Sequence, residues 1–204
     1  MNVYLKAVIH VVLISAILVV TYLVIESIQQ PLRFNAEQKR RYEATIQRLK
    51  DIRTAQVAFR SENKRYTNNF DTLIEFLKTD SFRVVMQIGD EDDSVAVATG
   101  GIIRKTILVS VLDSLFKKNY PVDSLRFVPY TQGVEFEMDT AFLIAGNVKV
   151  NVFEVKVHDT ILLKGLDPQL LINFRADRRL KTGYDGLKVG SLKETTNNAG
   201  NWEF

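Results

Sequence analysis

An uncharged apolar segment near the start of the chain determines whether the protein is interpreted as a membrane protein or a soluble one. From Ala7 to Ile25 there is no Asp, Glu, Lys or Arg. A helix needs roughly 17 to 25 such residues to cross a hydrocarbon core of about 30 Å. A signal peptide has a shorter apolar run and a small-residue cleavage site, which is not evident after Ile25. Burial inside a soluble head is the alternative, but the remaining chain offers little core for so uniform a helix. We therefore expect a retained single-pass anchor in residues 1–30, with apolar side chains such as Ala7, Leu13, Ile17, Val20 and Ile25 in the lipid bilayer.

The charges beside this segment bear on its orientation. Lys6 precedes it, whereas Arg33, Lys39, Arg40, Arg41 and Arg48 follow it. The positive-inside bias alone would place the large domain in the cytoplasm. These cations can also bind anionic headgroups. The whole chain has 27 basic and 24 acidic residues, a net charge of +3, and no cysteine, which excludes disulfides and thiolate metal sites.

Residues 31–80 have the pattern of a juxtamembrane stem helix and a short second helix. Pro31 predicts a break or kink, and Asn35 is a good cap for a new helix that ends near Asn63. One face of this helix has apolar residues at three- and four-residue spacing, which predicts a stripe packed on the head. The stripe contains Ile46, Leu49, Ile52, Ala55 and Phe59.

The two ends of this region differ. Few apolar groups lie between Phe34 and Tyr42, so we expect that part of the stem to be free for partner helices. Asn69 and Asp71 are suited to start the short second helix, which should end by Asp80.

The stretch IQRLKDIRTAQVAFRSENKRYTNNFDTLIEFL, from Ile46 to Leu77, resembles the stem-to-head junction of type IV pilins and type II secretion pseudopilins. The ending Ala199–Glu203 is similar to the terminal motif of some major pseudopilins. The matching positions are Asn63, Arg65, Tyr66, Thr67 and Trp202.

This resemblance implies a non-catalytic structural or docking subunit of a bacterial envelope complex, related to type II secretion or type IV pili. It implies an inner-membrane anchor, a C-terminal head in the periplasm, and partners among other membrane-embedded subunits and possible further copies of the chain. Family members are processed at a Gly before the apolar run and carry a Glu five residues into it; this chain has neither. The resemblance therefore implies an unprocessed, static pilin-like subunit that keeps its first residues.

Residues 81–204 predict a β-rich head, which makes the fold class α+β. Enrichment in β-branched and aromatic residues predicts strands. They are 82–88, 102–111, 125–129, 134–144 and 148–157. Asp90–Asp93 and Gly100–Gly101 are expected loops, and Ala145–Asn147 a hairpin turn.

The later part of the head contains three further local patterns. A shift in the apolar phase predicts a β-bulge at Val152 and Phe153. Asp167 followed by Pro168 predicts a helix that ends before Gly183. The last twenty residues are expected to be extended and packed on the head, through Leu187, Val189, Leu192 and Trp202.

The sequence has no pattern typical of catalysis, so we expect no enzyme, no cofactor and no nucleic-acid partner. His10 lies in the apolar span and His158 at a strand end, so the two histidines do not suggest a metal site. Glu135 and Glu137 have the spacing of the solvent-exposed face of a strand. The acidic run at 90–93 and the region 185–198, where major pseudopilins often carry a calcium loop, match known ligand patterns poorly, so no metal is expected. The basic run of 175–181 is interpreted as a solvated or docking face. A single-pass sensor or ligand-binding module is the alternative function.

Overall fold

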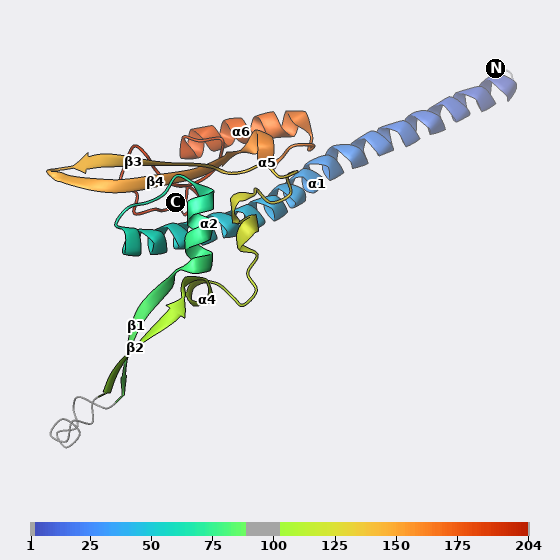
Figure 1. The fold of residues 1–204 in the computed structure, drawn as a ribbon. Helices are drawn as coiled ribbons and strands as arrows, with labels where there is room; N and C mark the ends of the chain where they lie inside the picture. Colours follow the sequence, from blue (N-terminus) through green and yellow to red (C-terminus); the bar gives the residue numbers. More distant parts are fainter. Residues whose placement is uncertain (1–2, 89–102, 204) are drawn as a thin grey trace.

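In the computed structural model, which describes residues 3–88 and 103–203, one helix joins the two halves of the molecule. This helix, α1 (Val3–Asn63), is uninterrupted over 61 residues. Its N-terminal part projects alone, and its C-terminal part passes through a head of short helices and small antiparallel sheets (Figure 1). The architecture is a mixture of helix and antiparallel sheet, compatible with the expected α+β class.

Helix α1 continues through Pro31, so the predicted break at this residue and the new helix start at Asn35 are wrong. A proline inside a helix removes one hydrogen bond to the residue four positions earlier. Long helical segments flank Pro31 on both sides, the first one apolar and the second packed on the head. The stability of these segments outweighs the loss of one hydrogen bond. The anchor and the stem are therefore a single element.

The end of α1 and the next helix follow local signals. The helix ends at Asn63 as predicted, and Lys64 after it takes the left-handed conformation, with φ of 60°. Helix α2 (Phe70–Thr79) confirms the short second helix, because the Asn69 side chain accepts a hydrogen bond from the Asp71 amide and Asp80 follows its last turn.

Strands β1 (Ser81–Ile88) and β2 (Ile103–Ser110) form a separate two-stranded antiparallel sheet. They confirm two of the predicted strands. The short helix α4 (Val111–Leu115) follows β2, and the hairpin extends from the head beside it (Figure 1). The expected loops at 90–93 and 100–101 lie outside the described residues.

The strand predicted at 125–129 is wrong. The chain forms a 3-10 helix, η1 (Val122–Arg126), because Val122 and Leu125, three residues apart, both turn into the core. Only an isolated bridge between Phe127 and Glu135 remains of the expected strand.

The second sheet has the order β3 (Glu137–Ala145), β4 (Val148–His158), β5 (Gly186–Gly190), all antiparallel. The predicted turn around Gly146 is confirmed, whereas the predicted bulge is wrong, because the β3–β4 register is continuous. Val152 and Phe153 are both buried because the two faces of the sheet are both covered at this point.

The remaining elements surround this sheet. Helix α5 (Asp159–Leu162) follows β4, and α6 (Pro168–Thr182) confirms the helix predicted between Asp167 and Gly183. Strand β5 confirms part of the extended C-terminal segment that was expected to pack on the head, because its Leu187 and Val189 are fully buried. The following chain returns along the outer edge of β5 through the bridge between Val189 and Gly200.

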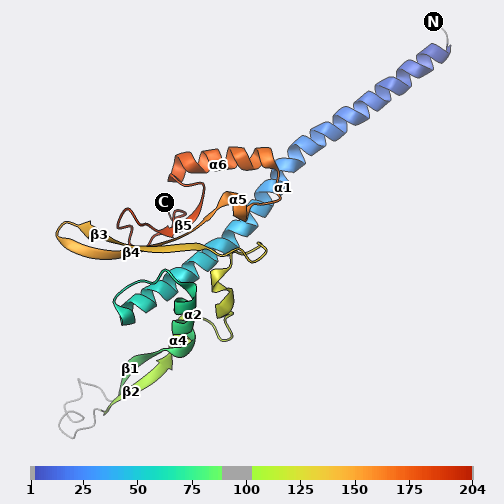
Figure 2. The same ribbon diagram turned by 45° about the horizontal axis from the view of Figure 1, so that its top comes forward.

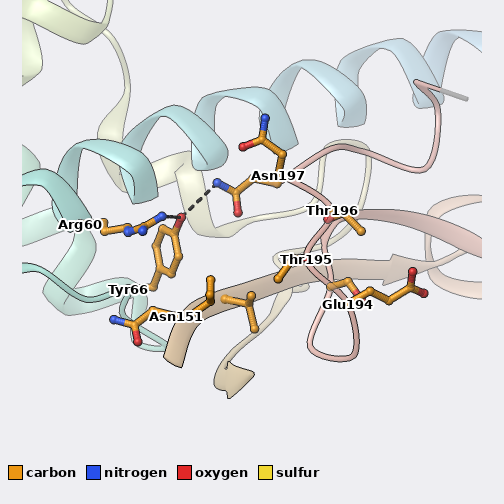
Figure 3. A pocket seen from close by; sticks show the side chains of 11 residues that line it. Arg60, Tyr66, Asn151, Glu194, Thr195, Thr196 and Asn197 are labelled. Carbon is orange, nitrogen blue, oxygen red and sulfur yellow. Dashed lines mark hydrogen bonds between the residues drawn. The ribbon is translucent and has the colours of Figure 1, made fainter. Parts of the chain in front are cut away.

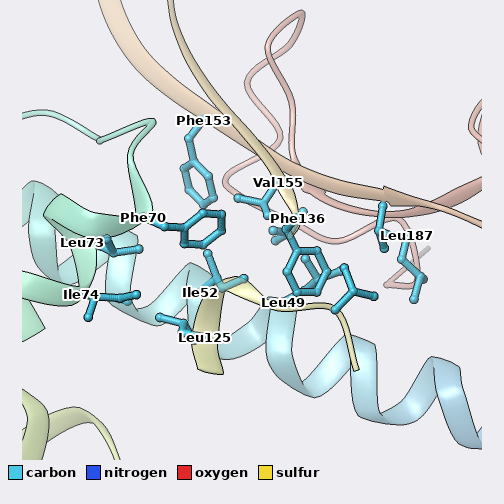
Figure 4. Close-up of a cluster of buried hydrophobic side chains, with 14 of the residues drawn as sticks. Leu49, Ile52, Phe70, Leu73, Ile74, Leu125, Phe136, Phe153, Val155 and Leu187 are labelled. Atoms are coloured by element: carbon cyan, nitrogen blue, oxygen red, sulfur yellow. The ribbon is translucent and has the colours of Figure 1, made fainter. Parts of the chain in front are cut away.

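The core lies between the C-terminal part of α1, helix α2 and the β4–β5 part of the sheet (Figure 4). Leu49 and Ile52 of α1 are fully buried, and Phe59 is almost so. The stem stripe is therefore packed inside this head, with Ile46 partly buried at its margin. Its closest aromatic contact is the edge-to-face pair of Phe59 and Phe76, with ring centroids 5.2 Å apart.

Candidate functional site

The first functional feature is the bare half of α1. Among the described residues it is the one helix long and apolar enough to cross a membrane, judged by length and composition. None of its apolar segment is buried against the head. The side chains of Leu13, Ile17, Val20 and Ile25 are between 48% and 63% exposed, and Ala7 lies in the same helix. Within the part of the chain that the structure describes, no other element covers this surface.

The second feature is the junction between α1 and α2, centred on Tyr66. The Tyr66 hydroxyl accepts hydrogen bonds from Arg60 Nη1 and from Asn198 Nδ2, each at 3.0 Å. Its ring lies against Phe153, with centroids 4.7 Å apart. The tyrosine thus joins the end of α1, strand β4 and the C-terminal segment.

A small cavity of about 210 Å³ opens beside Tyr66 (Figure 3). Asn151 forms one wall, and Glu194 to Asn198 of the C-terminal segment form another. The Thr196 hydroxyl is buried without a hydrogen-bond partner. The volume is below the roughly 300 to 1,000 Å³ of most ligand pockets.

The other junction residues have structural contacts. The side-chain Nδ2 of Asn63 donates to the Phe59 carbonyl in the last turn of α1. Thr67 is held by its backbone, since its amide donates to Gln56 Oε1 and its carbonyl accepts from Gln56 Nε2. Arg65 is exposed. Asn63, Tyr66 and Thr67 thus stabilise the turn between α1 and α2, whereas Arg65 faces solvent.

Trp202 lies apart from this turn, half-buried against the core, with its ring where a side chain at Gly200 would stand. The next residue, Glu203, reaches α1, where Arg53 Nη1 donates to its Oε1 at 2.8 Å. The same Arg53 Nη1 donates to the Asn198 carbonyl at 3.3 Å, so that one arginine of α1 holds the C-terminal segment at two points.

A third feature, which the sequence did not reveal, is a buried polar cluster between α1, α5, α6 and β5. Its centre is Asp159, which is fully buried and accepts a short hydrogen bond from the Tyr42 hydroxyl. The Arg178 guanidinium lies over the Tyr42 ring and donates to the Gly186 carbonyl at 2.9 Å. The prediction that the 34–42 part of α1 is free is wrong, because Phe34 and Tyr42 are buried. The basic run of α6, predicted as a solvated or docking face, combines both, since Arg178 bonds to β5 and Lys181 is 68% exposed.

Helix α6 covers this part of α1 with an aromatic residue. The Phe174 ring makes edge contacts with Phe34 and Tyr42, at centroid distances of 6.1 and 5.7 Å. At the start of α6, the Gln30 side chain donates to Oδ2 of Asp167, the N-cap residue, at 2.6 Å. The head thus contacts α1 down to residue 30.

Asp185 is the second carboxylate of the cluster. Its Oδ2 accepts from Arg175 Nη2 at 2.6 Å and from Arg179 Nη2 at 2.9 Å. His158 Nδ1 lies 3.5 Å from the other oxygen, Oδ1. Arg175 and Arg179 share the α6 face that is turned toward β5, which explains the spacing of the basic run.

The pKa values of the two carboxylates, Asp159 and Asp185, are shifted in opposite directions. Burial raises the pKa of Asp159 above its ordinary value, and the hydrogen bond from Tyr42 only partly offsets this. Burial also raises the pKa of Asp185, but hydrogen bonds from Arg175 and Arg179 outweigh it, so that the net pKa is lowered. Burial raises the pKa of Tyr42, which keeps its hydroxyl protonated as a donor.

This cluster is suited to hold elements together rather than to act on a substrate. Asp159 is out of reach of solvent, and Asp185 already accepts from two arginines. Within residues 3–88 and 103–203, no group of three or more His, Cys, Asp or Glu side chains lies close enough to hold a metal ion. Glu135 and Glu137 form surface ion pairs with Arg126 and Lys156.

Comparison of the chain with protein-family models, with curated proteins and with solved structures finds no match. Any function must therefore be inferred from the residues and their geometry.

Proposed function

We propose that this protein is a non-catalytic, membrane-anchored, pilin-like subunit that docks other subunits of a bacterial envelope complex. The observation that carries the proposal is the continuity of α1. One uninterrupted helix presents an uncovered apolar half and then supplies the buried stripe of Leu49, Ile52 and Phe59 to the head. A rigid connection of this kind fixes the head relative to the membrane.

The contacts between head and α1 support this role. Gln30 reaches Asp167, and Arg41 Nη1 donates to the carbonyls of Leu162 and Lys164 at 3.1 and 3.0 Å. The residues that come after the apolar segment are thereby held against α5 and α6. The apolar face that remains uncovered belongs to the anchor, where bilayer lipid and transmembrane partners would contact it.

The direct test is capture of partners in mild detergent. The tagged full-length chain is purified from membranes, and co-purifying proteins are identified by mass spectrometry. The proposal predicts several envelope membrane proteins, of the secretion or pilus type. Recovery of the chain alone would contradict it.

Two matched variants show whether the anchor itself selects partners. One has alanine at Leu13, Ile17 and Val20, and the other has alanine at Val11, Ile14 and Leu18, on a different face of the helix. Both keep an apolar helix. If the anchor packs on a specific subunit, one variant loses that subunit at least tenfold more than the other; equal capture by both would assign the anchor to lipid contact alone.

A ligand-binding sensor is the second candidate, and one cavity favours it. A hollow of about 710 Å³, within the usual range for ligands, is lined by Tyr130, Gln132, Val134, Thr160 and Lys164. A sensor would bind a small molecule there with its affinity reduced by Thr160→Leu. The docking subunit predicts partner capture that is unchanged by Thr160→Leu.

A further inference from the structure

The β1–β2 hairpin is an incomplete sheet. Its eight residue pairs bond only to each other, and within the described residues no other strand adds to either edge. Apolar side chains of the hairpin are exposed to solvent, with Val85 60% and Leu108 71% exposed. An isolated two-stranded hairpin is only marginally stable in water, and further strands or a covering layer are needed.

The larger sheet has one open edge. Its β5 edge is covered by the C-terminal segment, since the Gly190 amide donates to the Ala199 carbonyl and the Asn201 amide to the Lys188 carbonyl, both at 3.0 Å. In the part of the chain that is described, β3 pairs only with β4. Phe142 and Ile144 on β3 are 61% and 82% exposed. The nine-residue β3 edge therefore offers unpaired backbone groups beside uncovered apolar side chains.

The two open elements have opposite charge. Strands β1 and β2 contain Arg83, Arg104 and Lys105 and no acidic residue. Strand β3 contains Glu137 and Asp139 and no basic residue. Opposite charges across a strand pair stabilise it, and like charges oppose it.

Their positions suit contact between neighbouring molecules. Met138 of β3 accepts a hydrogen bond from Gln56 of α1, while Phe82 of β1 lines a hollow with Val57 and Ser61 of α1. Strand β3 and the β1–β2 hairpin therefore both begin beside the same part of α1, between residues 56 and 61. They extend on opposite sides of that helix in both views (Figures 1 and 2).

We propose that the β1–β2 hairpin of one copy adds to the β3 edge of a second copy of this chain. Different surfaces meet, so the contact is head-to-tail and builds an open row rather than a closed dimer. The proposal rests on the anchored role proposed for the chain, because a shared membrane holds neighbouring α1 helices side by side and brings both edges to one height. Glu137 and Asp139 share one face of β3, and addition of the hairpin at this edge brings its basic strands to these carboxylates, with Arg83 and Lys105 on opposite faces of the hairpin.

Cysteine cross-linking tests this contact, since the chain has no cysteine of its own. Full-length chain with both Leu108→Cys and Phe142→Cys is treated in its native membrane with a short bifunctional maleimide. The head-to-tail row predicts a ladder of dimers, trimers and larger products. Each single variant should give no product beyond background, as should the control pair Leu108→Cys with Asn173→Cys on α6.

A charge exchange tests the chemistry of the recognition in the same double-cysteine background. Variant one carries Glu137→Lys and Asp139→Lys, and variant two carries Arg83→Glu and Lys105→Glu. Each alone places like charges at the contact and should lose the ladder at least roughly tenfold. Co-expression of the two should restore it, because each copy then meets the opposite charge on its neighbour.

The outcomes separate this proposal from the anchored role. A ladder that the charge variants leave unchanged, or no ladder from the double-cysteine chain, overturns the head-to-tail contact. Dimers from Phe142→Cys alone would also overturn it, since they require a symmetric contact. Cross-links to a different protein would assign the open edges to another partner strand and overturn self-association. Alkaline carbonate extraction of the same membranes reports on anchoring alone.

Discussion

At the scale of single residues, Asp185 is the side chain on which the α6 contact depends. It accepts from Arg175 and Arg179 of α6, and its backbone carbonyl accepts from the Asp159 amide. We predict that Asp185→Asn lowers the free energy of unfolding of the head by about 2 kcal/mol, because the hydrogen bonds that Arg175 and Arg179 donate to this buried group lose their charge assistance. Urea unfolding of the detergent-solubilised full chain measures this.

The matched control is Asp177→Asn on the same helix. Asp177 is 54% exposed and, among the described residues, pairs with the exposed Lys181 alone, so its removal should cost less than about 0.5 kcal/mol. Equal losses for the two variants would mean that the Asp185 contacts contribute nothing beyond a surface ion pair.

Asp159 predicts a pH dependence of stability of defined sign. Burial raises its pKa in the folded protein, so the folded state binds this proton more tightly than the unfolded state does. Ionisation above the folded pKa therefore costs stability, and this cost disappears as the pH falls toward the ordinary carboxyl pKa of 3.8. Asn at position 159 stays neutral and keeps an acceptor for Tyr42.

The expected result is a difference in unfolding free energy, wild type minus Asp159→Asn, that rises as the pH is lowered through this range and is flat above it. Asp185, whose lowered pKa gives the opposite trend, is present in both proteins and cancels. A difference that falls with decreasing pH would show that Asp159 is stabilised as the anion by Arg178. Unfolding at a series of pH values provides the measurement.

At the scale of elements, the stripe on α1 supplies the contact between stem and head. Phe59 is 4% exposed and packs edge-to-face on Phe76 of α2. Phe59→Ala should destabilise the head by about 3 to 5 kcal/mol, as a large cavity forms in the core. Val57→Ala, at a half-exposed position two residues away, should change stability by less than about 0.5 kcal/mol. An unchanged melting temperature for Phe59→Ala would place the stripe outside the core.

Elements set by local signals were predictable from the sequence. Helices α2 and α6 begin where Asn69 and Asp167 cap the first turn, and α6 ends where Gly183 takes a φ of 68°. The β3–β4 hairpin follows from alternating apolar residues and the turn at Gly146. Each of these signals acts within a few residues, so no knowledge of the rest of the fold is needed.

Elements set by distant contacts were not predictable. Pro31 is a local helix breaker, and only the flanking helix and the contact of Gln30 with Asp167 show why α1 continues. The polar cluster joins Tyr42, Asp159 and Asp185 across more than a hundred residues, and no spacing within the sequence marks it. The basic residues of α6 were the one sequence feature that belonged to this cluster, and their helical spacing was equally consistent with a solvated surface.

At the scale of the whole molecule, the two ends of α1 are suited to different tasks. A bare apolar helix leads directly into the core of an α+β head, and α5 and α6 close on α1 just after the apolar segment. Tyr66 follows the C-terminal end of α1, where its ring packs on Phe153 of β4 and lines a hollow together with Phe82 of β1. The apolar end of α1 and the junction with the two hairpins thus lie at opposite ends of one helix.

The most direct test of this arrangement is protease accessibility of the full-length chain in spheroplasts, combined with alkaline carbonate extraction of the membranes. An anchored periplasmic subunit predicts a chain that carbonate does not release and a head that external protease digests while the bilayer is intact. A chain released by carbonate, or a head digested only after lysis, would contradict it.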